Sequence, residues 1–384
     1  MEFKDWFCLK ERESFTIDPK INPGDARFYF GRETVEKQIK SQVRRAFVDP
    51  GVPKMIIFGP YGSGKTQTLF YLEHYLRADK PRACRLEPRT IHLDLEMYSK
   101  AKHYDWHLQL LEQLGRDTVI EWIDNLSRRG PDFEGELRKV FEDANLTAAA
   151  FKLSRKDMSF LAWQWFCGRT LSAKDLETLE VTRNMGQTGA VDLVNALVGI
   201  GKLAVANGEA LTFLMDEAEQ FTRVRSGDEA EFLHDYLRKL AEPSNAVVGF
   251  VIAGTALALD DMAPLLIRDD IRTRLGDHNF IEIPTLASVE NVRAFAQELL
   301  TELVDSEQAE ARIQEKGLKV SIETYPFTSD AFDILCAYAS DDPIKSLPRN
   351  IIKTINECAI TAWDEDKSIV NVDIVNEVAP LIFG

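Results

Sequence analysis

The sequence lacks several features that define common classes of protein. Its five cysteines are far apart and form no C-x-x-C pair, which argues against a disulfide framework and against a zinc ribbon. No apolar run approaches the ~18 residues that a membrane span needs. Residues 1–6 carry charges where a secretory signal needs an apolar core. We therefore expect the protein to remain in the reducing cytoplasm.

An excess of positive charge is also absent. Aspartate and glutamate number 62 against 46 lysines and arginines, so the formal net charge is −16. This balance disfavours tight, sequence-independent binding of nucleic acid through the general surface. A local basic patch is one candidate for contact with DNA, although a solvated helix face also has this spacing: Arg32, Lys37, Lys40, Arg44 and Arg45. A protein partner or effector is therefore expected in preference to bare DNA.

One stretch matches the phosphate-loop pattern G-x-x-x-x-G-K-[ST]. It reads Gly59-Pro60-Tyr61-Gly62-Ser63-Gly64-Lys65-Thr66. An apolar run at 55–58 precedes it, and a helical pattern with Leu69, Leu72 and Leu76 on one face follows it. This order of strand, loop and helix is the context that the motif requires. The sequence therefore predicts a cradle for the phosphates of a nucleoside triphosphate.

The positions of this loop have predicted roles. Its three glycines are expected to take positive φ angles and to turn backbone N–H groups inward. Lys65 is expected to reach the β- and γ-phosphates, and Thr66 to bind Mg²⁺. The helix that begins near Lys65 points its positive end at the anion. We assign contacts with ATP to the whole stretch, which ends at Gln67.

The segment just upstream of the loop is expected to contact the base. It contains Phe30-Gly31-Arg32 and continues into an amphipathic helical pattern from Val35 to Phe47. Because it lies immediately before the phosphate loop in the chain, we predict that it folds against the nucleotide and helps to hold adenine.

A second chemical landmark follows about 150 residues after the loop. The apolar run at 210–215 is typical of a buried parallel strand, and it ends in Asp216 and Glu217. A carboxylate at the end of such a strand suits a Mg²⁺ site, and a neighbouring carboxylate can orient or deprotonate the attacking water. We therefore assign Asp216 to Mg²⁺ and Glu217 to the water.

Further strands are predicted around these two landmarks. An alternating run at 90–95 and apolar runs at 246–253 and 279–283 bring the predicted strands to five. The run at 246–253 leads to Thr255, whose hydroxyl can contact the γ-phosphate or position the water. The alternative is that Thr255 only caps the segment that follows.

Together these landmarks resemble the AAA+ ATPases, and among them the initiator-like group that includes the origin recognition complex. The resemblance is carried by Phe30-Gly31-Arg32-Glu33, the phosphate loop, Asp216-Glu217, Gly254-Thr255, Thr273-Arg274-Leu275-Gly276 and Pro348-Arg349-Asn350. It implies that Thr255 is sensor 1 and that Arg349 is the sensor 2 arginine that contacts the γ-phosphate. It further implies an arginine finger at Arg274, with Arg272 as the alternative. A finger acts on a neighbouring subunit's nucleotide, so a homo-oligomer is expected; for each arginine, a surface salt bridge is the other interpretation.

The chain departs from the initiator pattern in two places. Initiators carry a winged-helix DNA-binding domain after the lid, but only about 20 residues follow the predicted sensor 2 helix here. A long helical stretch also separates the second and third predicted strands. Within it, the aromatic residues at 158–166 are expected in a core rather than on a partner-docking surface. In its overall plan the chain is similar to bacterial ATPases of mobile elements, such as transposition target selectors, or of phage-defence islands. The segments 165–169 and 179–181 are similar to defence-island ATPases of the BREX type.

We therefore predict an α/β fold: a P-loop NTPase with a parallel five-stranded sheet flanked by helices, followed by an all-helical AAA+ lid. The predicted domains are an N-terminal arm (1–25), a nucleotide-binding domain (26–285) with a helical insertion (about 99–207), and a lid (286–384). The predicted function is hydrolysis of ATP with Mg²⁺ to assemble and remodel an oligomer in a DNA-related process such as phage defence, transposition or replication. The alternatives are a nucleotide-dependent scaffold that recruits an effector and a small-molecule kinase.

Overall fold

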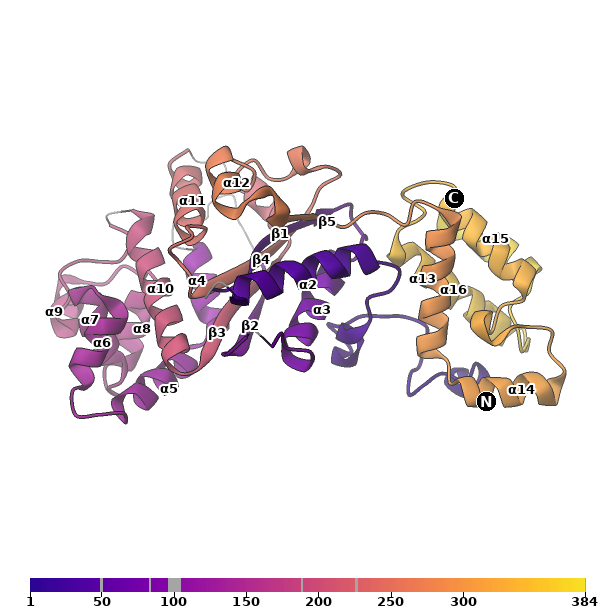
Figure 1. Cartoon of the computed structure of the whole chain (residues 1–384), viewed down its shortest axis with the longest axis horizontal. Coiled ribbons are helices and arrows are strands. Elements are labelled where there is room, and N and C mark those ends of the chain that lie inside the picture. Colours follow the sequence, from indigo (N-terminus) through magenta and orange to yellow (C-terminus); the bar gives the residue numbers. More distant parts are fainter. Residues whose placement is uncertain (49–50, 83, 96–104, 188, 225–226, 384) are drawn as a thin grey trace. The chain divides into compact units, whose positions relative to one another are not determined.

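The computed structural model describes residues 1–48, 51–82, 84–95, 105–187, 189–224 and 227–383 (Figure 1). The chain divides into two compact units, each with its own hydrophobic core. The first, called here the helical unit, comprises Met1–Lys37, Gly59–Tyr71 and Ile283–Gly384. The second, called the sheet unit, comprises Gln38–Phe58 and Leu72–Glu282. The predicted domain boundaries stay a prediction.

A five-stranded sheet lies at the centre of the sheet unit (Figure 1). Its strands are β1 (Lys54–Gly59), β2 (Glu87–Asp94), β3 (Glu209–Asp216), β4 (Val248–Thr255) and β5 (Phe280–Glu282). Their order in the sheet is β2-β3-β4-β1-β5. The pairs β2–β3, β3–β4 and β1–β5 are parallel, and Asp94 stands opposite Asp216 in the register of the first pair. The predicted α/β fold with a five-stranded parallel sheet is confirmed.

The strands form because their sequences are nearly continuous apolar runs, as in parallel strands that are covered on both faces. Phe213 in β3 and Val251 in β4 are fully buried. Gly249 allows close approach of a neighbouring backbone, since a Cβ there would lie 2.7 Å from the carbonyl oxygen of Pro53. The N–H of Phe250 donates to that same oxygen at 2.9 Å. These contacts hold the residue just before β1 against β4.

Helices flank the strands and fill the connection between β2 and β3 (Figure 1). They are α2 (Glu33–Val48), α3 (Lys65–Ala78), α4 (Asp105–Leu114), α5 (Arg116–Ser127), α6 (Phe133–Phe141), α7 (Ala144–Leu153), α8 (Ser159–Phe166), α9 (Ala173–Leu179), α10 (Ala190–Ala206), α11 (Gly227–Leu240) and α12 (Asp269–Leu275). Of these, α10 packs against β3, α6 packs against α10, and α7 packs against α6. The connection is helical, as predicted, in its described part; its predicted first residues, 99–104, lie outside the described residues.

Aromatic side chains build the core of this helical connection. Trp106, Trp122, Trp165 and Phe166 are at most 2% exposed. The predicted core interpretation of the aromatic stretch at 158–166 is therefore confirmed for most of its rings. Phe160 is the exception, because its side chain is 65% exposed.

The helical unit contains most of the remaining helices. They are α1 (Phe3–Trp6), α13 (Val289–Leu303), α14 (Ser306–Lys316), α15 (Ser329–Ser340), α16 (Pro348–Asp364) and α17 (Val372–Phe383). The all-helical region after the sheet is as predicted, and α16 begins at the proline expected in its first turn. No helix among the described residues is both long and apolar enough to span a membrane.

The first 28 residues contribute to the core of the helical unit. Phe7 and Phe15 are completely buried in the same cluster as residues of α13 and α15–α17. The N–H of Phe15 donates to Oδ1 of Asn356 at 3.1 Å, and the N–H of Lys10 donates to the carbonyl of Leu303 at 2.9 Å. Residues predicted as a lead-in arm therefore form part of a packed core.

Candidate nucleotide-binding site

The phosphate loop runs from the end of β1 to the start of α3. Gly62 and Gly64 have φ angles of 81° and 93°, the left-handed conformation that glycine adopts readily and that was predicted for them. The same prediction is wrong for Gly59, which does not have a positive φ. A small residue is needed there because a Cβ would lie 2.5 Å from the carbonyl oxygen of Ile283 and 2.8 Å from Oγ of Ser63.

Hydrogen bonds within the loop hold its shape. Nζ of Lys65, which is only 8% exposed, donates to the carbonyls of Gly59 and Pro60 at 3.1 and 3.0 Å. Thr66 is the second residue of α3, as its predicted role requires. The hydroxyl of Ser63 is buried and has no hydrogen-bond partner among the described residues. The loop therefore contains a polar group that its own fold leaves unsatisfied.

Gln67 contacts the upstream segment directly. Nε2 of Gln67 donates to the carbonyls of Asp25 and Phe28 at 2.8 and 2.7 Å. Phe30 stacks on Phe28 with ring centres 5.4 Å apart. The N–H of Gly31 donates to Oε2 of Glu298 at 2.8 Å. These contacts fix the upstream segment beside α3, whereas a role for Gln67, Phe30 and Gly31 in holding ATP stays a prediction.

Arg32 lies against the phosphate loop. Its guanidinium carbon is 4.0 Å from the place that a Cβ on Gly64 would occupy. The side chain is 7% exposed, and neither Nη1 nor Nη2 has a hydrogen-bond partner among the described residues. Burial lowers the pKa of Arg32, and interactions with Tyr29, a hydrogen bond among them, oppose that shift. A buried cation whose two Nη atoms lack acceptors is costly, so this guanidinium fits an anion held in the glycine loop.

A second arginine approaches the loop from α16. Nη1 of Arg349 donates to the hydroxyl of Tyr61 at 2.7 Å, and its guanidinium lies 5.4 Å from the centre of the Tyr61 ring. A Cβ on Gly62 would be 3.7 Å from Cβ of Arg349. Within the helical unit, the loop is therefore approached by Arg32 beside Gly64 and by the predicted sensor 2 arginine beside Tyr61 and Gly62.

The two predicted acids lie at the end of β3 in the sheet unit. Asp216 is 5% exposed, and its Oδ1 accepts the N–H of Glu217 at 3.0 Å. Glu217 is exposed and has a φ of 62°, a strained conformation for a residue that is not glycine. Desolvation, followed by the charges of Glu219 and Asp216, raises the pKa of Glu217. Its carboxylate is thus a better base than that of an isolated glutamate.

Glu219 is a residue of this cluster that the sequence reasoning missed. Its Oε2 accepts the N–H of Thr255 at 3.0 Å and so connects the segment after β3 to the end of β4. Burial raises the pKa of Glu219, but hydrogen bonds from backbone N–H groups outweigh burial and lower it. The signal in the sequence was the second acid in Asp216-Glu217-Ala218-Glu219, which alone does not distinguish a structural role from a surface turn.

The two candidate finger arginines lie on α12 and have different surroundings. Nη2 of Arg272 pairs with Oδ1 of Asp277 at 3.1 Å. Nη1 of Arg274 donates to the carbonyl of Asp270 at 2.6 Å and has no carboxylate partner among the described residues. The salt bridge considered as the alternative role is therefore present at Arg272.

The predicted site residues fall into two groups. Lys65, Arg32 and Arg349 gather around the loop in the helical unit, whereas Asp216, Glu217, Glu219 and Thr255 gather in the sheet unit. The strands β1, β3 and β4 belong to one sheet, and they end at Gly59, Asp216 and Thr255. Ligands of open parallel sheets bind outside such carboxyl ends.

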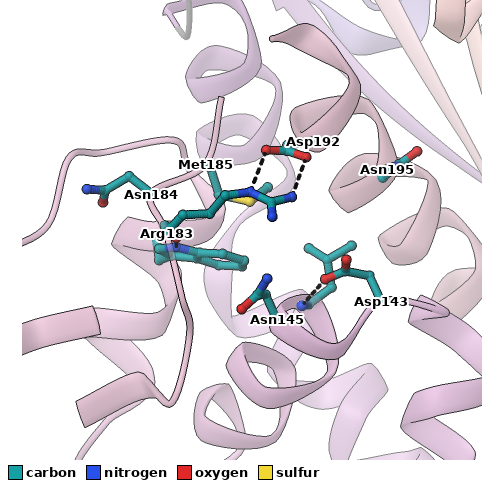
Figure 2. Close-up of a pocket in the computed structure, with 9 residues that line it drawn as sticks. Asp143, Asn145, Arg183, Asn184, Met185, Asp192 and Asn195 are labelled. Atoms are coloured by element: carbon teal, nitrogen blue, oxygen red, sulfur yellow. Dashed lines mark hydrogen bonds and ion pairs between the residues drawn. The ribbon is translucent and has the colours of Figure 1, made fainter. Parts of the chain in front are cut away.

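A polar hollow among α7, α8 and α10 lies apart from these groups within the helical connection. Figure 2 shows its labelled residues, including Arg183 and Asp192, which make two hydrogen bonds of 3.3 and 3.0 Å. Oδ1 of Asn145 accepts the N–H of Thr182 at 2.8 Å. The hollow has a volume of about 20 Å³, which holds one water molecule. We interpret it as a structural hydrogen-bond network.

The parallel sheet, the glycine loop and the helical region define the fold of the AAA+ P-loop NTPases. Among solved structures, the chain is similar to the ORC2 protein of Aeropyrum pernix in its ADPNP–ADP complexes: the TM-score is 0.52 at 11% identity, covering 98% of this chain and 72% of that one. For the ADP form of the same protein the TM-score is 0.50 at 12% identity, covering 97% and 73%. The predicted resemblance to origin-recognition proteins is confirmed for the fold. No model of a known family matches the chain, and neither does any curated protein.

Proposed function

We propose that the protein is an ATPase that binds ATP in the phosphate loop. The observation that carries this proposal is the buried Arg32 guanidinium, which lies beside Gly64 and finds no acceptor for Nη1 and Nη2 in the described part of the chain. Phosphate oxygens are suitable acceptors, because an arginine fork matches their geometry. Arg32 is therefore assigned to a phosphate rather than to adenine.

The other residues have these proposed roles. Lys65 leaves the loop carbonyls and binds the β- and γ-phosphates, and Arg349 binds the γ-phosphate. Thr66 and Asp216 hold Mg²⁺, which neutralises charge on the phosphates when bound. Thr255, held by Glu219 through its backbone, positions the terminal phosphate or the water.

The proposed reaction is attack of water on the γ-phosphorus. As the oxygen–phosphorus bond forms, Glu217 accepts a proton from the water, and the bond to the bridging oxygen of ADP breaks. The products are ADP and inorganic phosphate. The raised pKa of Glu217 supports its role as the base, since an acceptor works best when its pKa is near the working pH.

The proposal also covers the assembly of the protein and its biological role. Arg274, or Arg272 in its place, acts on the nucleotide of a neighbouring copy, so ATP drives a homo-oligomer. The fold shared with an origin-recognition protein supports a DNA-related process, and phage defence and transposition remain the proposed settings. The alternative is a nucleotide-dependent scaffold that recruits a protein effector or DNA, with little hydrolysis.

Replacement of the proposed base is the first test. Glu217→Gln keeps the size of the side chain but removes proton acceptance, so we expect ATP binding to persist and turnover to fall about 10²–10⁴-fold. Glu121→Gln, an exposed glutamate on α5, is the control for the change of charge. Binding is measured by calorimetry and turnover by phosphate release. A Glu217→Gln protein that turns over like the parent removes Glu217 from the mechanism.

A further inference from the structure

A hollow in the sheet unit lies at the opposite end of β1 from the phosphate loop. It has a volume of about 270 Å³. The described residues that line it come from α2, from residues 51–53 and the start of β1, from the segment between α11 and β4, from the end of α12 and from the turn before β5: Gln42, Arg45, Ala46, Gly51, Val52, Pro53, Lys54, Met55, Ala241, Pro243, Asn245, Ala246, Arg274, Leu275, His278 and Asn279. It therefore lies at the amino ends of three adjacent strands, β4, β1 and β5. β1 has six residues, so the hollow and the loop are separated by roughly 17–20 Å along that strand.

The charges of this hollow are opposite to those of the chain as a whole. Arg45, Lys54 and Arg274 line it together with His278, and none of its described lining residues is acidic. The net charge of the chain is −16. Positive groups that are gathered in one place repel one another, and this repulsion is unfavourable for the folded state. An anion in the hollow would remove that cost.

None of the three cations is neutralised by an ion pair among the described residues. The side chain of Arg45 makes no hydrogen bond or ion pair with another described residue. Arg274 donates only to the backbone carbonyl of Asp270, and Nζ of Lys54 donates to the backbone carbonyl of Glu242 at 2.8 Å. The carboxylate of Glu242 instead pairs with Lys239 at 3.0 Å. The neighbouring Arg272, by contrast, is paired with Asp277.

Lys54 lies in a poorly solvated environment. Burial lowers its pKa to about 8, and the charge of Glu242 opposes this shift only in part. A buried ammonium group gains from an anionic neighbour because the attraction is strong where water is scarce. Lys54 is thus partly buried, whereas Arg45 is exposed.

We propose that this hollow binds a phosphate ester through Arg45, Lys54 and Arg274. Two arginine forks and one ammonium group provide bidentate donors and a point charge, which is a donor set suited to phosphate. The volume is just below the ~300 Å³ of the smallest typical ligand pockets, so it suits one phosphorylated unit rather than a large ligand. That unit is either one link of a nucleic-acid strand or a free phosphate ester.

The proposal goes beyond the proposed ATPase and does not depend on it. It concerns the amino edge of the sheet, and its residues other than Arg274 have no part in hydrolysis. If Arg274 acted only as a finger on a neighbour's nucleotide, changing Arg45 would have no effect on binding of phosphate.

The test uses the full chain with Lys65→Ala, which disables the phosphate loop. Two double variants with the same change of charge are compared: Arg45→Gln with Arg274→Gln, and the control Arg128→Gln with Arg138→Gln. Both control residues are exposed arginines of the sheet unit that do not line the hollow and have no proposed role in binding. The probes are a labelled oligothymidylate, followed by anisotropy, and pyrophosphate, followed by calorimetry, at about 50 mM salt.

We expect the first double variant to weaken binding about tenfold or more, and the control to stay within about twofold. With the oligothymidylate, the slope of log affinity against log salt should decrease by about 1.4, since each phosphate contact on a single strand contributes about 0.7. Binding of the oligothymidylate alone identifies a strand as the source, and binding of pyrophosphate alone identifies a free phosphate compound. The proposal is overturned if neither probe binds, or if both double variants lose the same affinity. If Arg274→Gln unfolds the protein, Arg45→Gln against Arg128→Gln gives the same decision.

Discussion

The phosphate loop and the polar hollow of Figure 2 treat buried polar groups in opposite ways. In the hollow, the amide of the buried Asn184 accepts the N–H of Leu171 at 2.7 Å and donates to its carbonyl at 3.1 Å, and the partly exposed Arg183 is paired with Asp192. At the loop, Nη1 and Nη2 of Arg32 and the hydroxyl of Ser63 have no partner among the described residues. Folding alone favours the first arrangement. We infer that a ligand supplies the missing partners at the loop, whereas the hydrogen bonds in the hollow stabilise the fold.

His107 is another buried polar group whose hydrogen bonds are satisfied, and it provides the test with the largest expected effect. Its ring nitrogens lie 2.8 Å from the hydroxyl of Tyr236 and 2.8 Å from the carbonyl of Phe166, and burial lowers its pKa to about 4. The unfolded chain binds a proton near pH 6.5, so the folded state loses stability as the pH falls from about 6.5 to about 4. We expect a loss of about 3 kcal/mol from this group, measured by urea unfolding at several pH values.

The control for that experiment replaces a histidine elsewhere. His107→Gln should remove most of this acid dependence, whereas His74→Gln should leave it in place. If the parent and His107→Gln lost stability equally on acidification, the histidine would not be held neutral by its surroundings.

Arg32→Met tests the unsatisfied region, and its two effects should have opposite signs. Loss of a charged donor to phosphate costs about 1.5–3 kcal/mol, so ATP affinity should fall about 10–100-fold. Removal of an unpaired buried charge should raise the free energy of unfolding without nucleotide by about 1 kcal/mol or more. Calorimetry and urea unfolding measure the two quantities.

Arg27→Met is the matched control, because Arg27 lies on the same segment but stacks over Phe28, 4.7 Å from the ring centre. It should leave ATP affinity unchanged. A protein with Arg32→Met that binds ATP as the parent does would show that the guanidinium has a purely structural role.

Asp192→Asn sharpens the comparison from the other side with the smallest effect. The change weakens a partly exposed ion pair, so we expect a loss of about 1 kcal/mol in unfolding free energy, reduced by solvent screening. ATP affinity should not change. A clear loss of ATP binding, with stability intact, would give the hollow a role in function that our interpretation does not include.

The sequence predicted those parts of the molecule that are encoded locally. The phosphate loop is one continuous motif, and the strands are continuous apolar runs, so both follow from short-range patterns. Contacts between distant segments were not predictable in this way. The packing of Phe7 and Phe15 with α16, the place of Arg32 beside Gly64, and the bond from Thr255 to Glu219 all depend on tertiary structure.

Gly59 and Arg274 show the same limit at single positions. At Gly59 the motif predicted the residue type, but the physical reason is a close approach of Ile283 rather than a positive φ. At Arg274 the family pattern implied a finger, whereas its place beside Arg45 and Lys54 is visible only after folding, since Arg274 is distant from both in the chain.

The central claim is that the glycine loop binds the phosphates of a nucleotide, and calorimetric titration with ATP and Mg²⁺ tests it most directly. The parent chain should bind ATP, and Lys65→Ala should bind at least about tenfold more weakly, because a charged donor to two phosphates is lost. A parent chain that takes up no ATP, or a Lys65→Ala chain that binds it equally well, would contradict the account.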